Sequence, residues 1–192
     1  MLNAAIDETT KASSNTSRAI VDALLASHGN VEGNGETNLL AHSGGTLVGN
    51  IALKQFAELG YTNSNLHIAY FGPASSTEAA VGAALDAAGL TSATPEQQAN
   101  WLAYGNIEGK KGAGSGLSYY NNANDPVSSV IGGNLGLPND YNNPEEPTYL
   151  QGAEVGSFLQ SVMELRALFT SNDSAHSTYR WNDPSTWPTE EL

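Results

Sequence analysis

The feature that most constrains the fold is a short apolar run that leads, through one serine, into two glycines and an amphipathic segment. Residues 38–42 read Asn-Leu-Leu-Ala-His, a run as long as a buried strand, and Gly44 and Gly45 stand just beyond it. From 46 to 59 the apolar residues recur at helical intervals, and Gly60 stands where glycine commonly closes a helix. This order predicts a strand, a sharp turn and a helix.

The same alternation continues along the chain. Residues 66–71 form a second apolar run of strand length, and 77–90 form an alanine-rich helical segment. Residues 94–97 carry a capping-box pattern with proline at the first helical position, which predicts a further helix. A third strand is expected at 117–121. Strands that alternate with helices favour a mainly parallel sheet flanked by helices, and so an α/β fold.

The remaining segments are assigned in the same way. A helix is expected around 20–26, ahead of the first strand, and another over 152–169. Residues 132–148 are rich in glycine, asparagine and proline and are expected to form a long loop, while the tail 170–192 shows no helical periodicity. There is no internal repeat and no linker composition. We therefore expect a single domain over 1–192, long enough to bury roughly 70% of its unfolded surface.

Charge and composition exclude several classes of function. Twenty acidic residues against seven basic ones give a net charge of −13, which repels phosphate backbones, so nucleic acid is not an expected partner. The apolar runs are too short to cross a bilayer, so stable membrane insertion is not expected. The absence of cysteine excludes disulfides and thiolate chemistry and leaves the compartment open. The first residues do not resemble a signal peptide, so an exported protein would carry its address elsewhere.

Ser43 is the candidate nucleophile. Ala41-His42-Ser43-Gly44-Gly45 matches the Gly-x-Ser-x-Gly elbow pattern, with alanine in place of the first glycine. The strained turn needs small residues two positions before and after the serine, and Ala41 and Gly45 are both small. The following helix directs free N–H groups and its positive dipole end at the same point, so Gly44 is the expected oxyanion donor. A plain Ser-Gly-Gly turn is the alternative.

The candidate base follows from the position of the histidines. A serine hydroxyl is a weak nucleophile until a base takes its proton, and the expected chain order is serine, acid, histidine. Of the four histidines, two precede Ser43 and one follows it too soon: His28, His42 and His67. His176 therefore remains, in a polar loop suited to an exposed imidazole; the alternative is an ordinary surface histidine.

The candidate acid is Asp125, which stands in Asn-Asp-Pro-Val directly after the third expected strand. A carboxylate at this point can lean toward the serine across the ends of parallel strands. A turn aspartate before proline, which is a common feature, is the alternative. Asp140 and Asp173 are the reserve candidates for the acid.

These motifs, taken in their chain order, resemble the α/β-hydrolase superfamily and particularly its lipase and esterase branch. The resemblance rests on His-Ser-Gly-Gly at 42–45, Phe-Gly-Pro at 71–73, Asp-Pro-Val at 125–127 and His-Ser-x-Tyr at 176–179. Together these motifs extend over roughly residues 18 to 180, and the ordered set is more specific than any single member.

The resemblance implies serine-dependent hydrolysis of carboxylic esters through an acyl-enzyme, with small-molecule or lipid esters as substrates. Amide, thioester and peptide substrates stay open, because a triad does not choose its acyl donor. No cofactor is implied. No metal is implied either, since the chain lacks a His-Glu-x-x-His motif and a complete calcium loop.

One departure from the family concerns the second oxyanion-hole donor. The family usually has an early strand whose His-Gly-type loop supplies it well upstream of the elbow, whereas His28-Gly29 lies directly ahead of the elbow strand, which is too close. Either residues 15–17 substitute, or the early strands belong to a longer parent chain, which favours a minimal or N-terminally trimmed core. A catalytic effector tail of a large secreted bacterial protein is one alternative reading, and a non-catalytic binding or interaction module is another.

Overall fold

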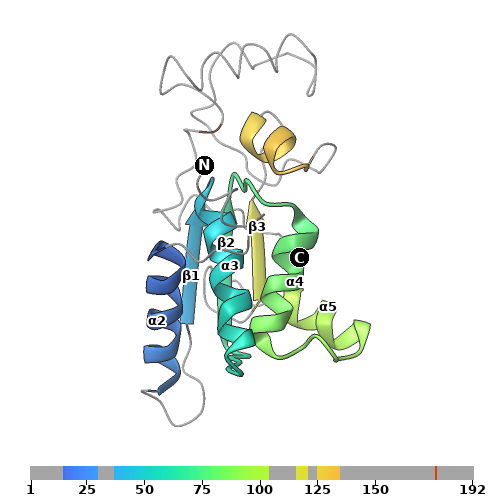
Figure 1. Cartoon of the computed structure of the whole chain (residues 1–192). Helices are drawn as coiled ribbons and strands as arrows, with labels where there is room; N and C mark the ends of the chain where they lie inside the picture. The colour runs from blue at the N-terminus through green and yellow to red at the C-terminus, as the bar shows by residue number, and fades with distance from the viewer. Residues whose placement is uncertain (1–14, 30–36, 104–115, 121–124, 135–175, 177–192) are drawn as a thin grey trace.

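The structure is a computed structural model that describes residues 15–29, 37–103, 116–120, 125–134 and 176. Figure 1 shows its elements, which follow in this order: α2 (Asn15–Gly29), β1 (Thr37–His42), α3 (Gly45–Glu58), β2 (Leu66–Phe71), α4 (Thr77–Ala88), α5 (Pro95–Ala103), β3 (Gly116–Tyr120) and the π-helical turn η2 (Val127–Ile131). The helix expected over 152–169, the tail 170–192 and residues 135–148 of the expected loop lie outside the described residues.

The three described strands form one parallel sheet in the order β1-β2-β3. His42 of β1 lies opposite Phe71 of β2, and Phe71 lies opposite Tyr120 of β3, so the carboxyl ends of the strands are level. The predicted α/β class with a parallel sheet is thus confirmed. Each segment that follows a strand, including the turn with Ser43, begins at the same edge of this sheet.

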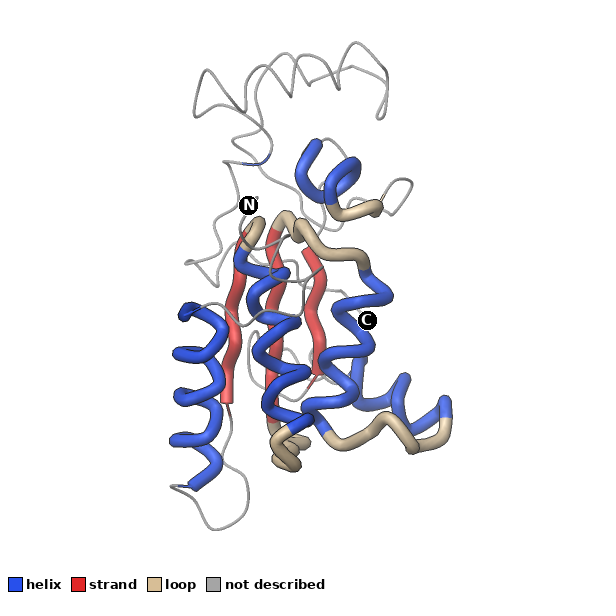
Figure 2. The backbone as a smooth tube through the Cα atoms, viewed as in Figure 1, coloured by secondary structure: helices blue, strands red, loops and turns tan. Residues whose placement is uncertain are grey.

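The helices α2, α3 and α4 lie side by side in one layer against the sheet, with α3 in the middle (Figures 1 and 2). Consecutive parallel strands joined by right-handed crossovers place their helices on the same face when the chain steps across the sheet in one direction. These three helices therefore cover one face of the sheet. They do not form the helical layer that the sequence predicts for the opposite face.

The apolar core lies between the sheet and the helices. β2 is buried along its whole length, as is typical of the central strand of a parallel sheet. Around it pack side chains of α3, α4 and α5 that are 9% exposed or less: Leu53, Phe56, Ala80, Ala83, Ala84, Ala87 and Trp101. Trp101 also donates its indole N–H to the Ser64 carbonyl at 2.8 Å. This core holds the sheet whose carboxyl edge carries the candidate site.

Most helix ends fall where the sequence predicts them. α3 closes at Gly60, which has φ +86° and donates its N–H to the Ala57 carbonyl at 2.9 Å. The capping box of α5 is present, since the Gln97 N–H donates to Thr94 Oγ1 at 3.3 Å and Gln97 Oε1 accepts the Thr94 N–H at 3.0 Å. α2 begins earlier than predicted, at Asn15, because its first turn is polar and hides the helical period of the apolar residues behind it.

Gly49 lies where α3 comes closest to the fully buried Tyr70 of β2. A Cβ at position 49 would stand 2.8 Å from the Tyr70 hydroxyl oxygen, and that hydroxyl donates a hydrogen bond to Asn50 Oδ1 at 2.9 Å. Gly49→Ala is therefore expected to lower the free energy of unfolding by about 1–3 kcal/mol through overpacking. This loss should exceed the gain of about 1 kcal/mol that alanine brings as the better helix former.

Gly82 of α4 provides the matched control, because a Cβ there would have nothing within 4 Å. Gly82→Ala should change the helix propensity and no packing contact, and so raise the free energy of unfolding by about 0.5–1 kcal/mol. Urea unfolding of both variants checks the pair. A Gly49→Ala protein as stable as the Gly82→Ala protein would contradict the close approach of α3 to Tyr70.

Candidate active site

Ser43 occupies the turn between β1 and α3. Its φ is +56°, and among the described residues it alone has a left-handed backbone without being a glycine. Such a conformation costs an L-residue on the order of 1 kcal/mol and persists only where the surroundings impose it. The Ser43 N–H donates to the Phe71 carbonyl at 3.0 Å, and the Ser43 carbonyl accepts the Thr46 N–H at 3.0 Å. The turn is thus held from the neighbouring strand and from the helix.

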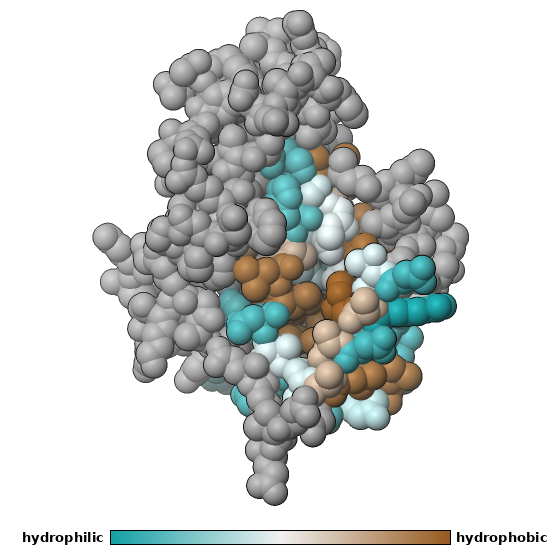
Figure 3. Space-filling view, turned by 90° about the vertical axis from the view of Figure 1, so that its left-hand side faces the viewer, coloured by the Kyte–Doolittle hydropathy of each residue, from teal (hydrophilic) through white to brown (hydrophobic). Residues whose placement is uncertain are grey.

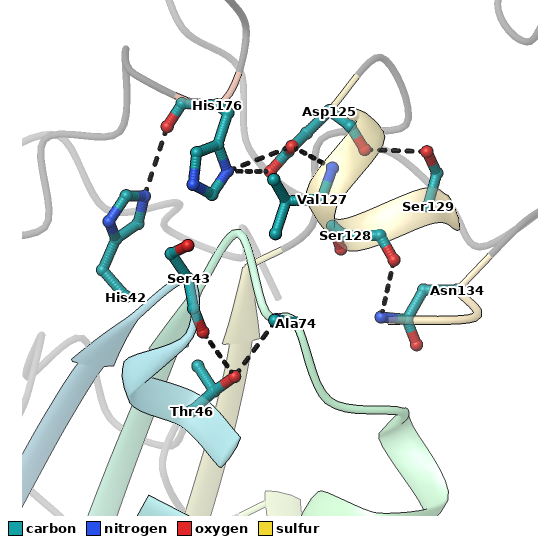
Figure 4. A network of polar contacts seen from close by, with 10 residues as sticks. All are labelled: His42, Ser43, Thr46, Ala74, Asp125, Val127, Ser128, Ser129, Asn134 and His176. Atoms are coloured by element: carbon teal, nitrogen blue, oxygen red, sulfur yellow. Dashed lines mark hydrogen bonds and ion pairs between the residues drawn. The ribbon is translucent and has the colours of Figure 1, made fainter. Parts of the chain in front are cut away.

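Thr46 adds a side-chain clamp to this turn. Its hydroxyl is fully buried, donates to the Ser43 carbonyl at 2.7 Å and accepts the Ala74 N–H at 3.1 Å (Figure 4). One threonine therefore joins the turn after β1 to the loop after β2. The elbow pattern in the sequence contains no signal for this role, since any helix can have threonine in its first turn.

The contact between Ala41 and Gly45 explains why alanine can replace the first glycine of the elbow pattern. A Cβ added to Gly45 would stand 3.7 Å from the Ala41 Cβ, which is an ordinary van der Waals distance. The turn therefore has room for the single methyl group of Ala41. The requirement for small residues on both sides of Ser43 accordingly tolerates this departure from the pattern.

Asp125 and His176 form a buried pair above the same edge of the sheet. Asp125 is fully buried and His176 is 8% exposed, so the expectation of an exposed imidazole at position 176 is wrong. The His176 Nδ1–H donates to the Asp125 carboxylate, at 2.9 Å from Oδ2 and 3.1 Å from Oδ1, and the Val127 N–H donates to the same Oδ1 at 2.8 Å. Because a carboxylate can only accept, the proton of the neutral imidazole lies on Nδ1 and leaves Nε2 as the basic nitrogen.

The Ser43 side chain points toward the His176 ring in Figure 4. The structure thus brings Ser43, Asp125 and His176 together from three separate segments. Figure 4 marks no hydrogen bond between the Ser43 hydroxyl and this ring. The reserve acids Asp140 and Asp173 lie outside the described residues.

The expected oxyanion donor lies at the start of α3. Gly44 is the N-cap of this helix, and within the described ranges neither its N–H nor that of Gly45 has an acceptor. Thr16, from the segment that could supply a second donor, lines a cavity together with His42 and Gly45. By contrast, His28 packs against the Phe56 ring toward the other end of α3, so it takes no part in this site.

The segment that carries Asp125 is fastened to the loop after β2. Asn134 donates its Nδ2–H groups to the Ser75 and Ser128 carbonyls, each at 3.1 Å, and its Oδ1 accepts the Thr77 N–H at 3.2 Å. A Cβ at Gly132 would stand 2.5 Å from the Pro73 carbonyl oxygen, so the two backbones are in close contact. Residues 132–134, the last of this segment, were expected to lie in a loop, and no sequence pattern marks Asn134.

His42, one residue before the candidate nucleophile, contacts the candidate base. Its ring stacks on the His176 ring with centroids 4.7 Å apart and planes 22° apart. Its Nε2 lies 3.2 Å from the His176 carbonyl oxygen, which can only accept, so His42 carries its proton on Nε2. Burial, and then the neighbouring His176 ring, lower the pKa of His42 to about 4, so this side chain is neutral at neutral pH.

The lowered pKa of His42 predicts a specific loss of stability in mild acid. The titratable groups that face this ring among the described residues are His176 and Asp125. Between the ordinary pKa of 6.5 and the folded-state pKa of about 4, the unfolded chain binds a proton that the folded protein excludes. His42 therefore favours unfolding progressively as the pH falls through this window, by up to about 3 kcal/mol, and contributes nothing above it.

His42→Gln cannot titrate and provides the test. Urea unfolding at several pH values from about 7 down to about 4 should show the variant gaining stability relative to the wild-type protein as the pH falls. If the free energies of unfolding of the two proteins changed with pH in parallel, the folded protein would not exclude the proton from His42.

Two further structural observations concern the described ranges only. No cluster of three or more His, Asp or Glu side chains there is arranged to hold a metal ion. None of the helices in these ranges combines the length and the apolar character needed to span a bilayer.

A comparison of the chain with protein-family models, curated proteins and solved structures finds no match.

Proposed function

We propose that this protein is a serine hydrolase of the α/β-hydrolase type that cleaves carboxylic esters through an acyl-enzyme on Ser43. The observation that carries the proposal is the buried Asp125–His176 pair, whose Nδ1–H is engaged by the carboxylate while the ring faces a serine in a left-handed turn. A base needs this tautomer to accept a proton from a hydroxyl. The parallel sheet supports the proposal, with its serine after β1 and its acid after β3.

In the proposed mechanism the Ser43 hydroxyl oxygen attacks the ester carbonyl carbon while His176 Nε2 accepts the hydroxyl proton. Asp125 holds the imidazole and stabilises the imidazolium that forms. The oxyanion develops beside the start of α3, where the Gly44 N–H and the positive end of the helix dipole favour negative charge. His176 then returns the proton to the leaving alcohol, and water releases the acyl group by the same steps.

An apolar cavity next to the elbow supports an acyl substrate. It has a volume of about 330 Å³ and is lined by Thr16, Ile20, Leu39, Leu40, Ala41, His42, Gly45 and Val48, which belong to α2, β1 and α3. Figure 3, which shows the molecule from the side of α2 and β1, has apolar side chains gathered on this face. A cavity that reaches Ala41 and Gly45 is close enough to Ser43 to receive the apolar part of an ester.

The test is labelling with a fluorophosphonate, which reacts with a serine whose proton a base can remove. The expected result is one adduct per chain on the wild-type protein, located at Ser43 by peptide mapping, and none on Ser43→Ala. His176→Ala should label far more slowly than wild type, because the hydroxyl loses its base.

A non-catalytic binding module on the same scaffold is the competing proposal, because no residue in the described ranges is assigned as the second oxyanion donor. Such a module has no need of an activated serine. A folded wild-type protein that the probe leaves unlabelled would therefore favour the binding module and contradict the hydrolase.

A further inference from the structure

His42 contacts the candidate base at two different points, on its side chain and on its backbone. The ring of His42 stacks on the ring of His176, with centroids 4.7 Å apart, and its Nε2–H donates to the His176 carbonyl at 3.2 Å. Figure 4 shows both contacts on the side of His176 away from Asp125. The contact with Asp125 determines which ring nitrogen of His176 carries the proton. The two contacts with His42 instead restrict the orientation of the His176 ring and the position of the His176 backbone.

The position of His42 in the chain gives these contacts a geometric consequence. His42 ends β1, where its backbone is held opposite Phe71, and Ser43 follows it directly. His176 comes from a segment 134 residues further along the chain. The contacts with His42 therefore fix the position of His176 relative to the end of β1. Only one peptide bond separates His42 from Ser43.

We propose that His42 is a positioning residue that holds the His176 imidazole over the Ser43 hydroxyl. This inference rests on the proposed hydrolase function. Both contacts require the chemistry of His42, because the stack needs a flat ring and the carbonyl needs an N–H donor at the ring edge. An imidazolium at His176 can lie against this ring during catalysis because His42 is neutral at neutral pH.

The loss of a positioning contact lowers the rate of the chemical step rather than the binding of substrate. A displacement of the base by about 1 Å costs on the order of a hundredfold in rate. In the 192-residue chain we therefore expect His42→Ala to lower kcat for a chromogenic ester, and the rate of fluorophosphonate labelling, by about 10- to 100-fold, with KM within about twofold of wild type. His42→Phe keeps a ring to stack on His176 but lacks the N–H, so it should recover part of the lost rate.

His28→Ala is the matched control. His28 also packs edge-on against two aromatic rings, those of Phe56 at 6.2 Å and Tyr61 at 5.4 Å, but it lies toward the other end of α3 from the elbow. This variant should label at the wild-type rate per folded molecule, with the folded fraction taken from thermal unfolding. A purely structural role for His42 would change the folded fraction and leave the rate per folded molecule unchanged.

The outcomes separate this inference from the function on which it rests. If the probe labels Ser43 in the wild-type protein and labels His42→Ala at the same rate per folded molecule, the positioning role is overturned and the hydrolase stands. If His42→Ala does not unfold cooperatively, His42→Phe decides by the same criterion, since it preserves the ring. A wild-type protein that is not labelled at all overturns the hydrolase itself.

Discussion

Ser43→Ala is expected to remove nearly all ester hydrolysis, with a loss in turnover on the order of 10⁶. Without the hydroxyl no acyl-enzyme can form, and the remaining rate would come only from binding and from the expected oxyanion donor Gly44 at the start of α3. The measurement is the initial rate with a chromogenic ester, together with the absence of a covalent adduct by mass. Full activity in a clean preparation of this variant would show that Ser43 is not the nucleophile.

The left-handed backbone of Ser43 provides a control that separates chemistry from folding. Alanine keeps the Cβ and therefore the strain of φ +56°, whereas glycine relieves it. Ser43→Gly should be as inactive as Ser43→Ala but more stable by about 1 kcal/mol, which raises the midpoint of thermal unfolding by about 2–4 °C in a domain of this size. Equal midpoints for the two variants would argue against a strained elbow.

Asp125→Asn is expected to lower turnover by at least about a hundredfold and up to about 10⁴-fold. The surroundings of this carboxylate supply the reason. The Val127 N–H donates to Oδ1, so an asparagine places its own carbonyl oxygen there and turns its NH₂ group toward His176 Nδ1. A donor at this point moves the imidazole proton to Nε2, where the ring can no longer accept the proton of the Ser43 hydroxyl.

The same substitution at other aspartates supplies the controls for Asp125→Asn. Asp86 accepts an exposed hydrogen bond from Thr91 at the end of α4, so Asp86→Asn should retain the wild-type rate. Asparagine preserves the shape of Asp125, and cooperative thermal unfolding verifies that the variant folds. Near-full activity in Asp125→Asn together with a loss in Asp140→Asn or Asp173→Asn would reassign the acid and leave the hydrolase in place.

The sequence predicts those parts of the fold that depend on local patterns. β1, β2 and β3 lie within one residue of their expected bounds, because each is a short apolar run bounded by turn residues. The end of α3 is marked by a glycine and the start of α5 by a capping box, whereas α4 ends at Ala88, before the expected residue 90, because the left-handed Gly89 caps it. The turn η2 was not predicted, since five residues after a proline are too few to show a helical period.

The residues of the candidate site also differ in whether a local sequence pattern predicts them. Ser43 is marked by its neighbours in the elbow, and Asp125 and His176 follow from the chemistry that a serine nucleophile needs. The residues that support them have no such signal. Thr46 meets the Ala74 N–H across 28 residues, and Asn134 meets the Ser75 carbonyl across 59, so these contacts exist only once the sheet has assembled.

The left-handed turn at position 43 also limits which side chains could replace Ser43 as the proposed nucleophile. Threonine offers the same hydroxyl, but its branched Cβ makes a positive φ a severe steric outlier. Cysteine is unbranched and would fit the turn with a thiol in place of the hydroxyl. We therefore expect Ser43→Cys to keep the backbone of this turn, whereas Ser43→Thr would require a different backbone at position 43.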